Sequence, residues 1–139
     1  MRKLLIFAVL AALKFRTGFA FADRPNESRN AASHVIVGEV LAVYVSETKS
    51  YKHYALAIEI EQVERGLELL QQDVVYVTCY QRKPGQSSLD ADSEGHLSVP
   101  KAGERVHVFL QGQRGRYEGL YPDWMDVLKP RSGRPEQAF

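Results

Sequence analysis

The stretch HVIVGEVLAVYV, residues 34–45, decides the fold of this 139-residue chain. Its many Val and Ile residues are β-branched, which disfavours a helix and favours an extended strand. Apolar residues occupy both parities of the stretch, so we expect a strand that lies centrally in its sheet or bends. Gly38 interrupts the stretch, and a glycine at such a place indicates a bulge or the close approach of a second strand.

Further segments along the chain also have the pattern of β-strands. Residues 51–66 alternate between apolar and polar side chains, as in a half-buried antiparallel strand, with an irregularity near Glu61 and an end at Gly66. The remaining strands are expected at residues 73–80, at residues 104–110 and, after a Gly-rich hairpin, in the first part of residues 116–128. This pattern predicts an all-β fold, a small five-stranded antiparallel OB-like barrel, because closure removes exposed sheet edges. A small β-sandwich is the alternative.

The N-terminal 22 residues have the organisation of a secretory signal peptide. Basic Arg2 and Lys3 precede the apolar run 4–13, and residues 20–22 (Ala-Phe-Ala) place small residues at the −3 and −1 positions of a cleavage site. The run is shorter than the roughly 20 apolar residues that a bilayer span requires. We therefore predict a secreted or periplasmic protein with no stable membrane span after cleavage. The alternatives are an uncleaved anchor and an amphipathic surface helix.

The rest of the chain divides by composition. Residues 23–32 are polar and lack apolar periodicity, so we expect a flexible lead-in there. Residues 33–129 form the predicted barrel domain, and residues 130–139 form a flexible tail. The turn-rich segment 82–103 is unusually long for a small domain, and such loops are often functional.

The charge of the processed chain bears on its partners. Residues 1–22 hold four of the 18 cations and no acid, so 14 cations face 17 anions in the remainder, a net charge of −3. An acidic domain is a poor match to the polyphosphate backbone of DNA or RNA. We expect a protein or glycan partner in the cell envelope or extracellular space and no nucleic acid. The oligomeric state stays open.

Four segments together are similar to a known barrel family. The series VIVGEVLAVY, YALAIEIEQVERG, DVVYVTC and GERVHVFL resembles the OB-type barrel of the netrin-like and metalloproteinase-inhibitor superfamily, over residues 34–121. The resemblance implies that architecture. The inhibitors' N-terminal Cys-x-Cys is absent, because the predicted mature terminus reads Asp23-Arg24-Pro25, and with one Cys their disulfide set is absent too. The resemblance therefore implies architecture alone, and a protease-inhibitor role would rest on fold analogy.

The single thiol and the histidines are the candidate reactive groups. Cys79 shares the parity of Val75 and Val77, which predicts core packing, with an intermolecular disulfide as the alternative. No two histidines have a metal-binding spacing in the sequence. His53 and His107 could combine with Glu59 or Glu61 if the fold brings them together, as a two-histidine-plus-carboxylate site. This would make the protein a metal-dependent hydrolase; otherwise we expect neither a metal nor a cofactor.

Aromatic residues and cations are the remaining candidates for binding. OB barrels hold ligands through exposed aromatic side chains beside cations. The candidate ligand-binding residues are Tyr80, Arg82, Lys83, Arg105, Tyr117, Tyr121 and Trp124. The alternative is that the tyrosines fill half-buried strands and the cations lie on solvated loops. No catalytic constellation is apparent, so we predict an exported, non-enzymatic binding or interaction module of unknown ligand, with its contact region near the 82–103 loop.

Overall fold

The computed structural model describes residues 24–85, 94–113 and 115–130, and within these ranges the chain is all-β, as predicted. A single turn of 3-10 helix, η1 (Arg29–Ala31), precedes the strands. The strands are β1 (His34–Glu47), β2 (Tyr51–Arg65), β3 (Val74–Arg82), β4 (Arg105–Gln113), β5 (Arg116–Gly119) and β6 (Met125–Leu128). The predicted signal peptide and residues 131–139 of the predicted tail lie outside the described residues.

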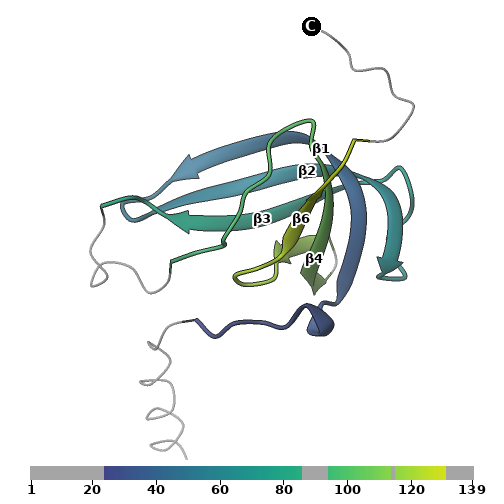
Figure 1. Cartoon of the computed structure of the whole chain (residues 1–139), viewed down its shortest axis with the longest axis horizontal. Helices are drawn as coiled ribbons and strands as arrows, with labels where there is room; N and C mark the ends of the chain where they lie inside the picture. Colours follow the sequence, from purple (N-terminus) through teal and green to yellow (C-terminus); the bar gives the residue numbers. More distant parts are fainter. Residues whose placement is uncertain (1–23, 86–93, 114, 131–139) are drawn as a thin grey trace, which may run out of the picture.

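Five strands close into a barrel (Figure 1). The order is β1-β2-β3-β5-β4, and β4 returns to pair with β1. The expected five-stranded barrel is confirmed, but the expected purely antiparallel pairing is wrong, because β3 and β5 are parallel. The connection between β3 and β4 carries the chain across the barrel, so β4 runs antiparallel to β1. Its hairpin partner β5 must then run in the direction of β3.

A sixth strand, β6, lies outside the barrel and was not predicted as a separate element. It pairs with the first half of β4, from Arg105↔Leu128 to Val108↔Met125. Its short length and the preceding Pro122 concealed it, because a proline normally marks the end of a strand.

Bulges bend the two long strands so that the sheet can close. The β1–β2 register shifts between Val37 and Gly38, where Glu61 is the extra residue on β2. A Cβ on Gly38 would lie 2.4 Å from the Glu59 carbonyl oxygen, so only glycine allows this approach. The predicted close approach at Gly38 and the predicted irregularity near Glu61 are both confirmed. Extra residues on one strand of a pair increase its local bend and twist, which a small barrel requires.

The barrel interior is filled by its own side chains. The inward row of β3 ends at Cys79, which is 2% exposed and belongs to the core, so the core-packing prediction for this residue is confirmed. The predicted parity of β4 is also confirmed, since Val106 and Val108 are buried. The fully buried side chains include Ile36, Val40, Leu56, Ile58, Ile60, Val77, Leu110, Leu120 and Trp124.

The segment before β1 packs against the barrel, which differs from the flexible lead-in expected for residues 23–32. Ala32 is buried, and Arg29 forms ion pairs with Asp123 and Asp126 at 2.9 and 2.7 Å. The Ser28 side chain caps η1. Hydrophobic periodicity in the sequence cannot predict these contacts, because polar side chains make most of them and their partners lie about 95 positions away. Within the described ranges, no helix has the length and apolar character that a bilayer crossing would need.

Candidate functional site

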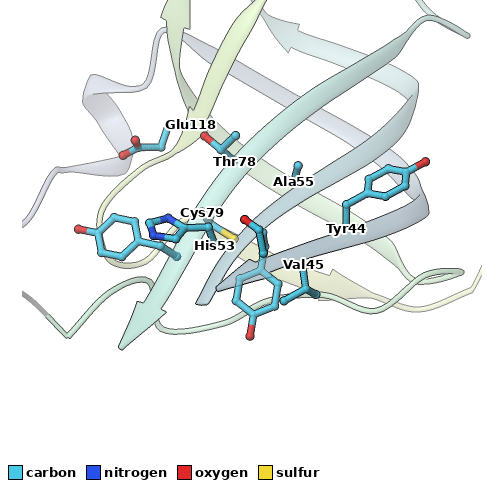
Figure 2. Close-up of a pocket in the computed structure, with 10 residues that line it drawn as sticks. Tyr44, Val45, His53, Ala55, Thr78, Cys79 and Glu118 are labelled. Carbon is cyan, nitrogen blue, oxygen red and sulfur yellow. The ribbon is translucent and has the colours of Figure 1, made fainter. Parts of the chain in front are cut away.

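The outer face of β1, β2 and β3 carries a groove of about 440 Å³ (Figure 2). Side chains from β1, β2, β3 and β5 border it. They are Tyr44, Val45, Ser46, His53, Tyr54, Ala55, Thr78, Cys79, Tyr80 and Glu118. A volume of this size suits a small-molecule or oligomeric ligand more than a single ion.

The alternation of side chains along the strands builds this groove. Tyr54 pairs with Cys79 across β2 and β3, and both side chains contribute to the core. The adjacent row therefore faces outward: Tyr44 pairs with Ala55, and Ala55 pairs with Thr78. Ala55 is small and forms a low floor, whereas Tyr44 is 60% exposed and forms a wall. The next outward row adds His53 (Figure 2) and its cross-strand partner Tyr80.

Polar groups lie on the side of the groove opposite Tyr44. The parallel pairing of β3 and β5 sets Glu118 beside Thr78. Glu118 is half-buried and forms an ion pair with Arg24 from the N-terminal segment. The Thr78 hydroxyl is 3.4 Å from the Tyr117 carbonyl oxygen, to which it donates. The groove thus offers a carboxylate, a hydroxyl and an imidazole facing an aromatic wall.

Arg24 joins the N-terminal segment to this end of the groove through its contacts with Tyr80 and Glu118. Its guanidinium donates to the Tyr80 hydroxyl at 3.2 Å and to Glu27 at 3.1 Å. It also lies over the Tyr121 ring, 4.7 Å from the centroid, in a cation–π contact. Burial by itself lowers the Arg24 pKa, but the bonds to Tyr80 and Glu118 outweigh it and raise the pKa above its usual value. Arg24 is therefore a permanent cation that holds Glu118 and Tyr80 in place.

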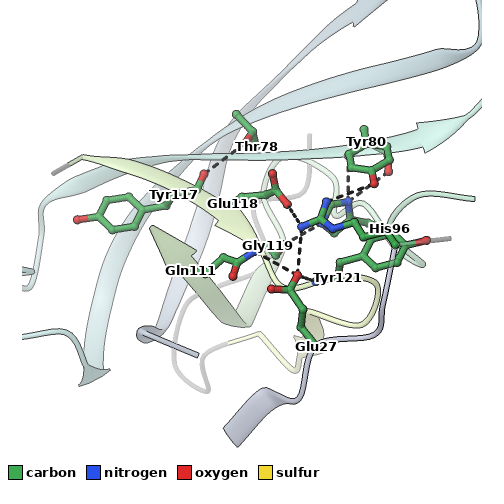
Figure 3. Close-up of polar contacts among 10 residues, drawn as sticks. Glu27, Thr78, Tyr80, His96, Gln111, Tyr117, Glu118, Gly119 and Tyr121 are labelled. Carbon is green, nitrogen blue, oxygen red and sulfur yellow. Dashed lines mark hydrogen bonds and ion pairs between the residues drawn. The ribbon is translucent and has the colours of Figure 1, made fainter. Parts of the chain in front are cut away.

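His96 is buried beneath the same end of the groove and holds Tyr80 in place. Its side chain is 2% exposed, accepts from the Tyr80 amide at 3.1 Å and donates to the Gly119 carbonyl oxygen at 2.8 Å (Figure 3). Burial lowers the pKa of His96, so the ring is neutral at pH 7 with its proton on Nε2. The ring also packs edge-on against Tyr80 at 5.0 Å. His96 thereby ties the strand that carries Tyr80 to the end of β5.

The predicted aromatic candidates occupy two different places. Tyr80 borders the groove and stacks on Tyr121 at 6.2 Å. Trp124 is buried behind them and donates to the Ser98 carbonyl oxygen at 2.8 Å. Tyr117 is buried elsewhere, edge-on to His34 at 4.8 Å. The expected exposed aromatic platform is therefore not formed by Tyr117, Tyr121 or Trp124, because Tyr117 points from β5 into the core and the other two are buried in the segment after β5.

The predicted cationic candidates are engaged with carboxylates. Arg82 pairs with Glu94 at 2.6 Å, and Lys83 pairs with Glu47 at 3.2 Å. Arg105 pairs with Glu61 at 2.7 Å on a different part of the barrel. None of these three cations lines the groove.

The histidine pair considered for a metal does not come together. His107 lies opposite Val37, whose partner on β2 is Gln62, and it bonds Glu64 at 2.8 Å. His53 lies nine residues from Gln62 along the same strand, a separation on the order of 20–30 Å. Glu59 is exposed on β2, facing Val74 of β3, and Glu61 is held by Arg105. The shared metal site is therefore excluded for these residues. Nowhere in the described ranges do three or more potential metal ligands gather.

The thiol beside the groove is not poised for nucleophilic chemistry. Burial, followed by the charge of Glu118, raises the pKa of Cys79 to about 12. A thiolate is the reactive form of cysteine, and at that pKa it is scarce near neutral pH. The described side chains around the groove thus offer binding contacts, and they do not pair a nucleophile with a base.

Several residues of the site were missed by the sequence analysis. The outward positions of Tyr44 and Thr78 follow from the alternation of β1 and β3 once the inward row is known. The contribution of Glu118 depends on the parallel β3–β5 pairing, and those of Arg24 and His96 depend on segments without regular structure. No local pattern in the sequence reports these three.

Comparison with protein-family models, with curated proteins and with solved structures finds no match to this chain.

Proposed function

We propose that this protein is an exported, non-enzymatic binding module that holds a glycan in the outer groove. The observation that carries the proposal is the groove itself, which the exposed Tyr44, the small Ala55, Thr78 and Glu118 line together. An aromatic face packs well on the apolar face of a sugar ring. Carboxylate and hydroxyl groups at fixed positions then bind the sugar hydroxyls and orient the ring.

The architecture supports an OB-type assignment within this proposal. The closed order β1-β2-β3-β5-β4 fits the five-stranded barrel of that type, whose β2–β3 face is its ligand-binding face in oligosaccharide binders. The groove of this protein lies on that same face. Secretion or a periplasmic location is proposed from the leader-like residues 1–22 alone.

The size of the groove and the charge of the chain favour a glycan over other partners. A specific protein interface buries about 800 Å² on each partner, the surface of roughly 20–30 residues, whereas ten residues line this groove. The net charge of −3 after removal of residues 1–22 repels polyphosphate.

Calorimetric titration with a panel of soluble oligosaccharides tests the proposal. Tyr44→Ala removes the stacking wall, and we expect the affinity for the bound sugar to fall by about tenfold, as loss of an aromatic contact implies. Tyr76→Ala is the matched control, because Tyr76 is similarly exposed (59%) on the same sheet and does not border the groove. The Tyr76→Ala variant should bind the sugar with unchanged affinity.

Two results would contradict a glycan ligand. Equal losses in the two tyrosine variants would show that the groove is not the site. A second contrary result is the absence of sugar binding, combined with an envelope protein whose capture depends on Tyr44, since this would assign the groove to a protein segment.

A further inference from the structure

A hydroxyl, an imidazole and a carboxylate are joined in one network at the start of β1. The Ser33 hydroxyl lies 2.7 Å from Nδ1 of His34, and Nε2 of the same ring contacts a carboxylate oxygen of Glu68. Ser33 is exposed, whereas the His34 ring is buried. None of the three residues borders the groove, so the inference drawn from them does not depend on the ligand proposed there.

The barrel holds the His34 ring in place from several sides. His34 begins β1 and pairs with Leu110 of β4. The Tyr117 ring of β5 packs edge-on against the imidazole at 4.8 Å. After the end of β2, Gly66 has a φ of +112°, and a Cβ there would lie 2.4 Å from Cδ2 of the ring. These contacts fix the imidazole with its Nδ1 toward Ser33.

The partners of the ring determine where its proton lies. A hydrogen bond from its own backbone, followed by the bond from His34, lowers the pKa of the Glu68 carboxyl, and the Tyr117 hydroxyl donates to it at 3.4 Å. A carboxylate only accepts hydrogen bonds, so the neutral imidazole carries its proton on Nε2, toward Glu68. Nδ1 is then an acceptor, and the Ser33 hydroxyl is the donor that faces it.

The other contacts of the Ser33 hydroxyl leave it able to react. The Leu110 carbonyl oxygen is 3.4 Å from Oγ, so the shorter contact of 2.7 Å directs the proton to His34. The Gly112 amide donates to Oγ at 3.2 Å and occupies one of its two lone pairs. The second lone pair is available to an electrophile that approaches from solvent.

We propose that Ser33 is a nucleophile that takes an acyl group from an activated ester, with His34 as its general base and Glu68 as the residue that positions His34. Ser33 Oγ bonds to the carbonyl carbon, and its proton moves to Nδ1. The bond from that carbon to the leaving oxygen then breaks, and the proton passes from Nδ1 to the leaving alkoxide or phenoxide. The same order of hydroxyl, imidazole and carboxylate activates serine in hydrolytic enzymes.

The site differs from a hydrolytic triad in the direction of its backbone donor. The Gly112 amide is bonded to Oγ itself, so it does not point at the oxygen that becomes negative during acyl transfer. Donors to that oxygen make the hydrolysis of an acylated serine fast. We therefore expect one serine of each chain to be acylated without rapid turnover, so the protein remains a binding module.

Reaction of the purified full chain with p-nitrophenyl acetate tests the inference. We expect peptide mass spectrometry to locate an acetyl group on Ser33. Ser98 in the same sample is the control, because it is also exposed but bonds Trp124 through its backbone and should be acetylated much more slowly. His34→Gln removes the base and should slow the acetylation of Ser33 about 100-fold, within the range that general-base catalysis contributes.

A thiol at the same position gives a second measurement. Ser33→Cys places a thiol beside Nδ1, where the imidazole favours the thiolate, so it should react with iodoacetamide at pH 7 about tenfold faster than Ser98→Cys. Cys79 is buried and should not contribute. Glu68→Gln combined with Ser33→Cys should shift the rise in reactivity to higher pH, because a neutral amide stabilises the imidazolium less than a carboxylate does.

Three results would overturn the inference. The first is equal acetylation of Ser33 and Ser98, and the second is acetylation of Ser33 that is equally fast in His34→Gln. The third is a Ser33→Cys thiol that reacts no faster than the Ser98→Cys thiol in a protein with an unchanged circular dichroism spectrum. That result would show that His34 does not activate the side chain beside it.

Discussion

At the scale of single residues, His96 shows how a buried imidazole can organise a binding surface without facing the ligand. Its two ring nitrogens join the Tyr80 amide to the Gly119 carbonyl oxygen, so it connects β3 to the end of β5. The bond from the Tyr80 amide requires a neutral ring, whose single proton on Nε2 then makes the bond to Gly119. Protonation would turn the acceptor nitrogen into a donor facing an amide N–H.

The lowered pKa of His96 predicts a loss of stability in mild acid. The unfolded chain binds a proton near pH 6.5, and the folded chain binds it only at lower pH, so the unfolded state holds more protons below 6.5. The free energy of unfolding should therefore fall as the pH drops through this window, by at most about 1.4 kcal/mol per pH unit from this group. Urea unfolding at several pH values measures it.

The control for this pH dependence is another histidine. His96→Gln keeps a donor toward Gly119 and removes the titrating group, so its stability should depend less on pH below 6.5. His107→Gln alters a histidine on the outer face of β4 and should keep the steep dependence of the unchanged protein. Identical pH profiles for the two variants would contradict the assignment to His96.

The thiol of Cys79 should be inert in the folded protein. With its pKa raised to about 12 by burial, we expect no reaction with a maleimide or an aromatic disulfide reagent at pH 8. Addition of urea should release one equivalent of reactive thiol together with the unfolding transition. Labelling that precedes unfolding would show that the barrel opens locally at β3.

At the scale of elements, the bend in β1 depends on one position without a side chain. Gly38→Ala would force a Cβ to within 2.4 Å of the Glu59 carbonyl oxygen and 2.8 Å of an Ile58 methyl group. We expect a loss of about 3 kcal/mol or more, because a rigid backbone atom cannot move aside. Chemical denaturation measures this change.

Gly103→Ala separates crowding from backbone strain. Gly103 has a φ of +90°, and a Cβ there would meet no atom within 4 Å. Its replacement should cost only the strain of the left-handed conformation, about 1 kcal/mol. If this variant lost as much stability as Gly38→Ala, close packing at the bulge would not explain the role of Gly38.

Most strands could be predicted from the sequence because each has a local signal. Alternation identified the inward faces of β2, β3 and β4, and parity placed Cys79 in the core. The parallel β3–β5 contact could not be predicted, since it depends on how the β3–β4 connection crosses the barrel. For that reason Glu118 was absent from the expected site, and β6, with four residues after a proline, had too short a pattern to recognise.

At the scale of the whole molecule, the N-terminal segment is fastened to three distant parts of the chain. Arg24 reaches Tyr80 and Glu118, and Glu27 accepts from Gln111 at 3.1 Å and from the Tyr121 amide at 3.0 Å. Polar complementarity between distant segments has no periodic signature, so composition alone described this segment as flexible.

Loss of the Arg24 side chain should release this segment. Arg24→Gln removes the cation between Glu27 and Glu118, and we expect about 1–2 kcal/mol less stability. Amide exchange in residues 27–32 should become faster, as mass spectrometry of hydrogen exchange would measure. Arg116→Gln, an exposed arginine of β5, is the control and should change stability by less than about 0.5 kcal/mol. Unaltered exchange in the Arg24 variant would mean that Arg29 and Ala32 suffice to hold the segment.

The two strand pairings that close the barrel, β1–β4 and β3–β5, also have a consequence for biogenesis. The β1–β4 pairing joins His34 to Leu110, and the parallel β3–β5 pairing joins Val77 to Tyr117. Both pairings therefore require residues from the last quarter of the polypeptide. A nascent chain emerging from the ribosome can form the β1–β2–β3 meander early but cannot shut the ring until about residue 119 has been synthesised. Such sequence-distant pairings slow folding into the range of milliseconds to seconds. The newly made polypeptide therefore stays open while most of its length is being translated.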